Sequence, residues 1–184
     1  MESCLQTHQL QYHPAHPPLA VRGVEAKILS VTDNWLRVRW RVDGVTKLVI
    51  PPFAGKGRKD NLWETTCFEL FVQRKGEPGY AEFNLSPSER WAAYDFTAPR
   101  EGMTERVFPR EPELVMRTGQ AMAIFDAALP RHQMPEPPCN VGLSAVIEEE
   151  GGGKSYWAIA HGKDEPDFHD PACFLGSIAR TRAA

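Results

Sequence analysis

Apolar and polar residues alternate along short stretches of this chain, which is the periodicity of β-strands with one buried face. The clearest stretch is residues 35–42, where the apolar side chains share one face and arginines occupy the other. Asp43 and Gly44 follow it, and this dipeptide favours a two-residue turn because glycine adopts positive φ without strain. Residues 45–50 alternate again, so the pattern predicts a β-hairpin over 34–50.

Further alternating runs, bounded by turn-forming residues, predict strands along most of the remaining chain. They cover residues 66–72, 80–85, 91–96, 113–118, 120–127, 141–149 and 155–160. About nine or ten short strands with almost no helix predict an all-β fold, in which two antiparallel sheets pack face to face as a β-sandwich.

The N-terminal residues and the rest of the chain differ in this alternation of apolar and polar positions. Residues 1–20 contain three prolines and no apolar period, so we expect an irregular N-terminal arm, which could lie extended along a sheet edge. Residues 21–180 are expected to form a single β-sandwich domain that binds a ligand. The length of 184 residues fits one domain that buries a core without disulfides or a structural metal.

The first two strands of a meander at 66–96 are expected to place polar residues on a common face. If their apolar residues face the core, the period of two places Glu69 opposite Glu82 and Cys67 opposite Asn84. This face is too polar for a core, which favours a ligand site. A solvated outer face, or carboxylates paired with arginines of a neighbouring strand, explains the same pattern.

The third strand of the meander adds two candidates. The alternation there predicts that Ala92, Tyr94 and Phe96 point inward, which leaves Trp91 and Asp95 on the polar face. An indole beside carboxylates and an amide is typical of a site that stacks on a ligand ring and hydrogen-bonds its polar groups.

Composition and charge exclude several partners. The net charge is −3 and basic residues are scattered among acidic ones, so we expect no nucleic-acid partner. No stretch approaches the roughly 20 apolar residues of a membrane span, and residues 1–18 lack the pattern of an export signal, so we expect a cytoplasmic protein without a membrane partner.

The four cysteines, at positions 4, 67, 139 and 173, lie too far apart for a zinc ribbon or a redox pair. We therefore expect four reduced thiols. Cys67 and Cys173 each precede a phenylalanine and are expected to be buried.

Several blocks of the sequence together resemble a known family. The segments are Asp60–Val72 (DNLWETTCFELFV), Tyr80–Ser88 (YAEFNLSPS), Arg90–Tyr94 (RWAAY), Tyr156–His161 (YWAIAH) and Pro166–Pro171 (PDFHDP). They are similar to DOMON-like proteins related to family-nine carbohydrate-binding modules, in their small single-domain bacterial branch. The resemblance covers most of residues 26–178 and implies a jelly-roll-like β-sandwich that holds a sugar, or in some branches haem, on one sheet face or its rim.

Trp63 is a candidate for stacking on a sugar ring. Asn61 and Glu64 flank it and could bond sugar hydroxyls. Within the resemblance, Trp63 and the Glu82-Phe83-Asn84 triplet match the pattern of the sugar-binding relatives. The alternative is that Trp63 closes the end of the core. On the late strand, Tyr156 and Trp157 must point to opposite faces, so only one of them can be presented to a ligand.

Two other kinds of chemistry are weighed against binding alone. Glu69, Glu82 and Asp95 could act as paired carboxylates in acid–base catalysis, but the sequence carries no GxSxG or HExxH motif, so we lean against an enzyme. His161, Asp167 and His169 are candidate ligands for haem or a metal ion. In a Pro-bounded loop such side chains more often bond the local backbone.

We therefore expect a non-catalytic module that binds a small, carbohydrate-like ligand, as a monomer or a homodimer, with no cofactor. The predicted binding residues are Trp63, Glu69, Glu82, Asn84, Trp91 and Asp95. The alternatives are a cytoplasmic hydrolase or lyase acting on a sugar derivative, and a haem- or metal-binding module.

Overall fold

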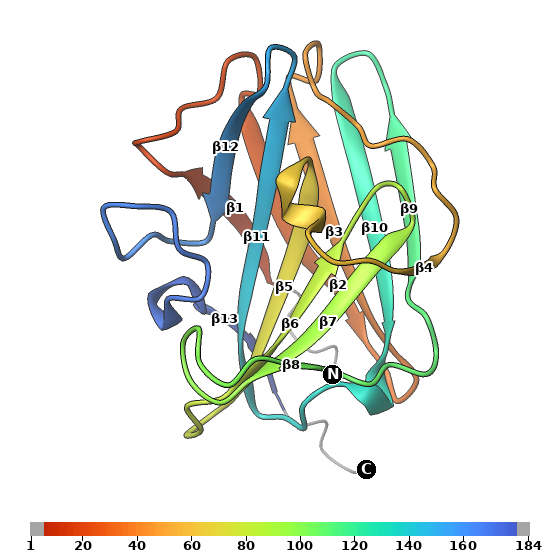
Figure 1. Cartoon of the computed structure of the whole chain (residues 1–184), viewed down its shortest axis with the longest axis vertical. Coiled ribbons are helices and arrows are strands. Elements are labelled where there is room, and N and C mark those ends of the chain that lie inside the picture. Colours follow the sequence, from red (N-terminus) through yellow and green to blue (C-terminus); the bar gives the residue numbers. More distant parts are fainter. Residues whose placement is uncertain (1–5, 180–184) are drawn as a thin grey trace.

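The computed structural model describes residues 6–179 and is all-β, with only three short 3-10 turns in that range (Figure 1). The prediction of an all-β fold with almost no helix is confirmed. The strands are β1 Thr7–Tyr12, β2 Gly23–Val31, β3 Trp35–Asp43, β4 Gly57–Arg58, β5 Cys67–Arg74, β6 Tyr80–Leu85, β7 Arg90–Phe96, β8 Thr104–Glu105, β9 Glu113–Thr118, β10 Met122–Pro130, β11 Cys139–Glu149, β12 Gly153–Ala158 and β13 Gly176–Ile178. The 3-10 turns are η1 Leu62–Glu64, η2 Arg131–Gln133 and η3 Pro171–Cys173.

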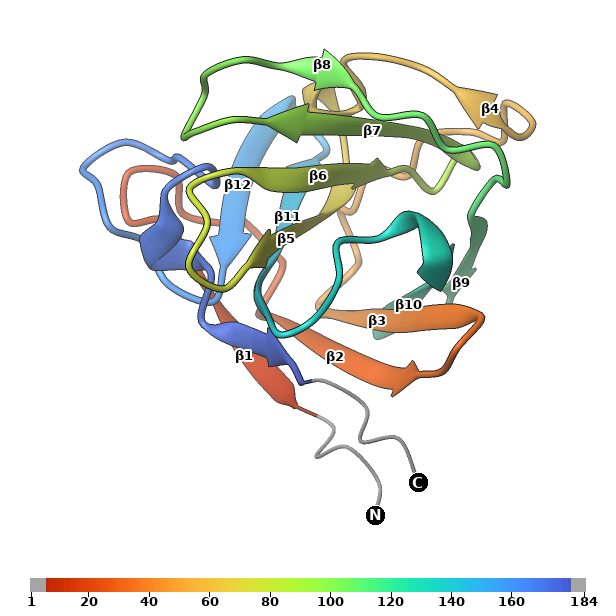
Figure 2. The ribbon, with the colours of Figure 1, turned by 90° about the horizontal axis from the view of Figure 1, so that it is seen from below.

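The strands form one curled sheet rather than two separate ones. Hydrogen-bonded neighbours follow the order β4-β7-β6-β5-β11-β12-β1-β2-β3-β10-β9, and β8 and β13 pair with β7 and β11. Figure 2 shows the two halves of this path facing each other. The predicted jelly-roll-like sandwich of two sheets is not confirmed, because β1 pairs with both β12 and β2. The purely antiparallel prediction is wrong, because β4 and β7 run parallel.

Strand β1 corrects the expectation of an irregular arm. Residues 7–12 are a strand, and Leu10 is buried in the core. The segment that follows is fixed by Glu149, whose buried carboxyl accepts hydrogen bonds from the backbone N–H groups of Leu19, Ala20 and Val21. These bonds hold the chain as it passes from β1 into β2. Residues 1–5 of the expected arm lie outside the described residues.

The core lies between the facing halves of the sheet. Trp40 of β3, Phe68 of β5 and Phe125 of β10 are fully buried, and the rings of Phe68 and Phe125 stack with centroids 4.5 Å apart. Burying each such side chain stabilises the fold by about 1.5–3 kcal/mol. The predicted strand at 35–42 is confirmed as β3, with its apolar residues in this core.

The predicted hairpin over 34–50 is wrong in its second half. Strand β3 pairs along one edge with β2 and along the other with β10, so no edge is left for residues 45–50. That segment turns away, and Leu48 forms an isolated bridge with Glu149. The predicted hairpin between residues 141–149 and 155–160 is present as β11 and β12.

Two smaller expectations concern thiols and membranes. Cys67, Cys139 and Cys173 are buried free thiols, while Cys4 lies outside the described residues. In the described range, none of the helical segments has the length and apolar character needed to cross a membrane.

Candidate functional site

A cavity of about 950 Å³ opens over one face of β5, β6 and β7. In Figure 1 this face lies toward the viewer, beside the short coil η1. The walls come from the segment around β4 and η1, from the β7–β8 region and from the loop after β12. The lining residues are His16, Arg58, Asp60, Asn61, Trp63, Glu69, Glu82, Asn84, Tyr94, Phe96, Arg100, Met103, Glu105, Val146, Tyr156, Glu165, Pro166, Phe168 and His169.

Three predicted site residues form the floor of this cavity. Glu69 of β5 pairs across the strands with Asn84 of β6, and Glu82 lies two residues before Asn84 on the same face. All three are buried, with 3–6% of their surface exposed. The predicted register, with Glu69 opposite Glu82, is wrong by two residues, and because a shift of two keeps the face, these residues still lie on a common face.

The face predicted for strand β7 is wrong. Leu85 pairs with Trp91, and Phe83 pairs with Ala93, so Trp91 shares the core face of these apolar residues. Trp91 packs there against Phe108 and is only 6% exposed. The turn after β6 sets this register, and the alternation of β7 alone does not reveal it.

Asp95 shares the core-side phase of Trp91 and does not line the cavity. Near the end of β7 its carboxylate binds the guanidinium of Arg106 at 2.6 Å. Tyr94 and Phe96, which were expected to point into the core, line the cavity instead. Trp91 and Asp95 are therefore not part of this cavity.

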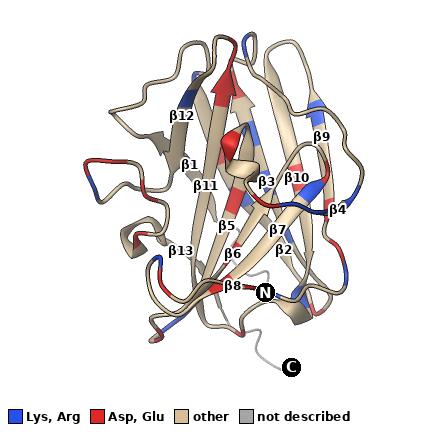
Figure 3. Ribbon diagram, viewed as in Figure 1, with Lys and Arg blue, Asp and Glu red and all other residues tan. Residues whose placement is uncertain are grey.

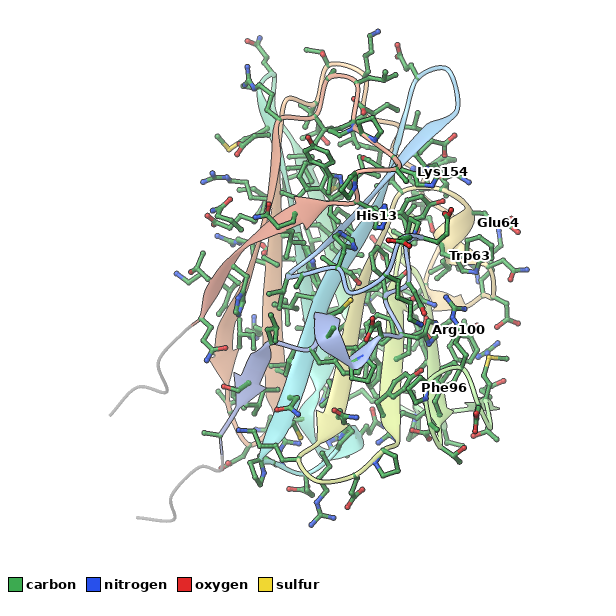
Figure 4. The ribbon with its side chains drawn as sticks, turned by 90° about the vertical axis from the view of Figure 1, so that its left-hand side faces the viewer. His13, Trp63, Glu64, Phe96, Arg100 and Lys154 are labelled. Atoms are coloured by element: carbon green, nitrogen blue, oxygen red, sulfur yellow. The ribbon has the colours of Figure 1, made fainter. Side chains whose placement is uncertain are left out.

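Trp63 lies at the rim, as the sequence suggested for a stacking residue. It belongs to η1 and is 49% exposed. Asn61 lies beside it in the left-handed region, at φ 59°, and also lines the cavity, whereas Glu64 does not. Figure 4 shows Trp63, Arg100 and Phe96 along the same side of the molecule.

The late strand β12 contributes Tyr156. Trp157 is buried in the core, and Tyr156 points to the opposite face, where it lines the cavity. Phe168 and His16 pack around the Tyr156 ring, with centroids 6.2 and 5.0 Å away. The two adjacent aromatics therefore point to opposite faces, as predicted, and Trp157 is the one in the core.

The pKa values of the two floor carboxyls, Glu69 and Glu82, are both raised. Burial raises the pKa of Glu82 to about 7, against the opposing effects of a hydrogen bond from Asn84 and the charge of Arg100. Burial, together with the nearby Glu82, raises the pKa of Glu69 well above its ordinary value. The two carboxyls therefore resist carrying two negative charges at once.

His169 connects the floor to the wall. Its Nε2 lies 3.7 Å from Glu82 Oε2, and its Nδ1 lies 2.7 Å from the hydroxyl of Tyr80. That hydroxyl also accepts a hydrogen bond from the backbone N–H of Arg100. Burial, with the charge of Arg100, lowers the pKa of His169 to about 4, so the ring is neutral at pH 7.

Two ion-pair clusters border the cavity. On one side, Arg58 contacts Asp60 at 2.8 Å and Glu105 at 3.2 Å and lies over the Tyr94 ring. Tyr94 donates a hydrogen bond to Asp60. Acidic and basic positions are interspersed over the ribbon as a whole (Figure 3).

On the opposite side of the cavity, Asp167 binds two cations. Arg100 Nη2 lies 2.8 Å from its Oδ1, and Lys163 Nζ lies 2.5 Å from its Oδ2. Asp167 also accepts a bond from the backbone N–H of His169. The two arginines that line the cavity, Arg58 and Arg100, are therefore both paired with carboxylates.

The candidate metal ligands do not form a common site. Asp167 is used by the cations just described, and both ring nitrogens of His169 face protein groups. His161 Nε2 bonds the carbonyl of Gln11 at 2.8 Å, and its Nδ1 is buried. Neither ring offers an accessible nitrogen to haem iron, and the described residues hold no group of three metal-binding side chains.

Comparison with solved structures finds chains of similar fold. The chain is similar to a candidate carbohydrate-binding protein from Bacteroides uniformis, with 17% identity, a TM-score of 0.62 and coverage of 94% of this chain and 84% of the other.

Two structures of a family-nine carbohydrate-binding module from Caldicellulosiruptor kristjanssonii are also similar. The cellotriose complex shares 10% identity at a TM-score of 0.54, covering 97% of this chain and 85% of the other. The glucose complex shares 8% identity at a TM-score of 0.53, covering 95% and 87%. No family profile matches the sequence, and no curated protein matches it.

Proposed function

We propose that this protein is a non-catalytic carbohydrate-binding module that holds a small sugar in the cavity over β5, β6 and β7. The observation that supports this most strongly is the buried set of acceptor side chains beneath a half-exposed indole. Glu69, Glu82 and Asn84 would accept bonds from sugar hydroxyls, while Trp63 would stack on an apolar ring face.

Asn84 adds a specific feature to this proposal. Its Nδ2 donates to Glu82 at 2.9 Å, and its buried Oδ1 has no hydrogen-bond partner among the described residues. An unpartnered buried acceptor costs about 1–3 kcal/mol, which a ligand hydroxyl would recover. The sugars named for the neighbours of similar fold, cellotriose and glucose, support this ligand class.

Isothermal titration calorimetry with glucose and cellotriose tests the proposal. We expect saturable binding to the wild type, and at least a tenfold loss of affinity in Trp63→Ala. Phe53→Ala is the matched control, because Phe53 is also exposed but lies outside the lining residues. Absence of binding to a panel of neutral, amino and acidic sugars at millimolar concentration would contradict the proposal.

A second candidate function is acid–base catalysis on a sugar derivative. The pKa of Glu82, about 7, suits a general acid or base near neutral pH, and Glu69 provides a second carboxyl on the same face. A measurement of substrate turnover distinguishes catalysis from sugar binding alone. If Glu82→Gln abolishes a measured conversion and retains substrate binding, the site is catalytic.

The finer assignments are part of the same proposal. We propose a relationship to DOMON-like domains, which the sequence resemblance supports, and a cytoplasmic location. Monomer or homodimer is the expected state, which size-exclusion chromatography with light scattering measures directly.

A further inference from the structure

The floor of the cavity is built from hydrogen-bond acceptors. Glu69, Glu82 and Asn84 are each more than nine-tenths buried and line the cavity. The amide Nδ2 of Asn84 is already used by Glu82, which leaves the buried Oδ1 of Asn84 without a hydrogen-bond partner among the described residues. A ligand that bonds this oxygen must therefore bring a donor.

The charges around the cavity are unbalanced. Arg58 and Arg100 line it, and both are engaged by carboxylates at the rim, namely Asp60 and Glu105 for the first and Asp167 for the second. The five carboxyl residues that line the cavity outnumber these two cations; they are Asp60, Glu69, Glu82, Glu105 and Glu165.

No cation of the protein neutralises the floor itself. Within the described range, neither Glu69 nor Glu82 forms an ion pair with lysine or arginine, and the imidazole facing Glu82 is that of His169. Burial raises the pKa of both carboxyls, while Arg100 only partly opposes this. Buried carboxylates without a cation are costly, so a ligand cation would relieve a cost that a neutral hydroxyl leaves in place.

The walls suit a cation as well as a sugar ring. Trp63, Tyr94, Phe96, Tyr156 and Phe168 place aromatic surface around the acceptors. An ammonium group near such rings is attracted by the ring quadrupoles. A bare divalent ion fits less well, because calcium takes six to eight oxygen ligands and the described residues provide no group of three metal-binding side chains.

We infer that the ligand is an amino sugar, whose protonated amine lies against Glu69 and Glu82 while its ring stacks on Trp63. This inference rests on the proposed sugar-binding function and names the ligand class within it. The amine supplies a donor for the Asn84 oxygen and the positive charge that no residue of the floor provides. An N-acetylated sugar keeps the ring and loses the charge.

Calorimetry at pH 7 and low salt with glucosamine, glucose and N-acetylglucosamine tests the inference. We expect glucosamine to bind at least tenfold more tightly than either neutral sugar. In Glu69→Gln and Glu82→Gln, the ratio of glucosamine to glucose affinity should fall toward one, whatever the absolute affinities. Glu77→Gln, which removes an exposed carboxylate on the β5–β6 loop, should keep the wild-type ratio.

The other outcomes separate this inference from the proposed function. Equal or tighter binding of glucose overturns the amino-sugar assignment and leaves sugar binding intact. Failure of all three sugars to bind at millimolar concentration overturns both. Calcium chloride alone is titrated as well, and displacement of glucosamine by Ca²⁺ at this floor would overturn the assignment in favour of a metal site.

Discussion

Asn84 Nδ2 donates a hydrogen bond to Glu82 Oε1 across 2.9 Å, on the face of β6 that forms the floor of the cavity. Because this bond fixes the amide, its Oδ1 is directed away from Glu82 and has no partner among the described residues. The two residues thus present one free acceptor and one carboxyl at fixed positions. This pair is the part of the site on which the proposed recognition of ligand donors depends.

Replacing Asn84 by alanine is expected to weaken sugar binding by about tenfold, which corresponds to the loss of one hydrogen bond, roughly 1.4 kcal/mol. Calorimetric titration of the variant measures this. Asn140→Ala is the control, because Asn140 bonds Gln73 on β5 and does not line the cavity. An unchanged affinity in Asn84→Ala would show that the free Oδ1 does not contact the ligand.

Trp63 is expected to act on binding and not on folding. Because half of its surface is exposed, Trp63→Ala should change the free energy of unfolding by no more than about 1 kcal/mol, whereas Trp40→Ala should cost about 3–5 kcal/mol. Urea denaturation of both variants checks this difference. If Trp63→Ala unfolds as easily as Trp40→Ala, the indole closes the core and is not a stacking surface.

The burial of Glu82 predicts a pH dependence of stability. Its pKa is about 7 in the folded protein, against an ordinary 4.5, so between these values the folded state holds a proton that the unfolded state releases. Stability due to Glu82 is therefore present below pH 4.5 and lost as pH rises to about 7. The lowered pKa of His169 acts in the opposite sense, from 6.5 down to about 4.

Glu82→Gln isolates the first of these effects. Measured against the wild type, the variant should gain about 1–3 kcal/mol of relative stability between pH 5 and pH 8, because the amide cannot ionise. Chemical denaturation at the two pH values gives the difference, in which the contribution of His169 largely cancels. Glu77→Gln, the control, should show no such gain. If the stability of Glu82→Gln relative to the wild type is the same at pH 5 and pH 8, Glu82 ionises in the folded protein without a cost in stability.

Gly142 of β11 pairs with Phe71 of β5 and leaves room for an aromatic ring on the face of the sheet that carries the site. A Cβ at this position would lie 2.6 Å from Cδ1 of Phe174, which packs against Phe71 beneath His169. Gly142→Ala is therefore expected to destabilise the fold by about 1–3 kcal/mol and to disturb the His169 environment. Gly23→Ala, where a Cβ meets nothing within 4 Å, is the control. Thermal unfolding of both variants measures the difference, and equal melting temperatures would contradict this packing.

Much of the fold followed from local alternation. The strands at β3, β5, β6, β11 and β12 were predicted because apolar residues recur there with a period of two, and the structure buries those residues. Residues 45–50 show the limit of this argument. They alternate like a strand, yet β3 already has partners on both edges, and pairing between distant segments is not encoded in local periodicity.

The candidate site, like the fold, was predicted only in part from the sequence. Glu69, Glu82 and Asn84 were found because polar residues recur on the face of two neighbouring strands that lies opposite their apolar core residues. Trp91 and Asp95 were misplaced because the register of the β6–β7 turn, not the composition of β7, decides which face each residue occupies.

His169 and Arg100 reach the floor from loops, and sequence alternation carries no information about where loops return. The block containing His169 was singled out for the family resemblance and as a source of candidate metal ligands, not as part of the cavity floor. Its contact with Tyr80 depends on the path of the segment after β12, which the sequence pattern does not specify.

The most direct test of the cavity as the sugar site is an NMR titration that follows the five tryptophan indole N–H signals. Of these side chains, only that of Trp63 lines the cavity, while Trp40, Trp91 and Trp157 are buried in the core. Trp63→Phe assigns its signal. On addition of glucosamine, glucose or cellotriose, we expect the Trp63 signal to shift and saturate while the core signals stay in place. Saturable binding that leaves the Trp63 signal unmoved, or that shifts a different indole, would contradict the site described here.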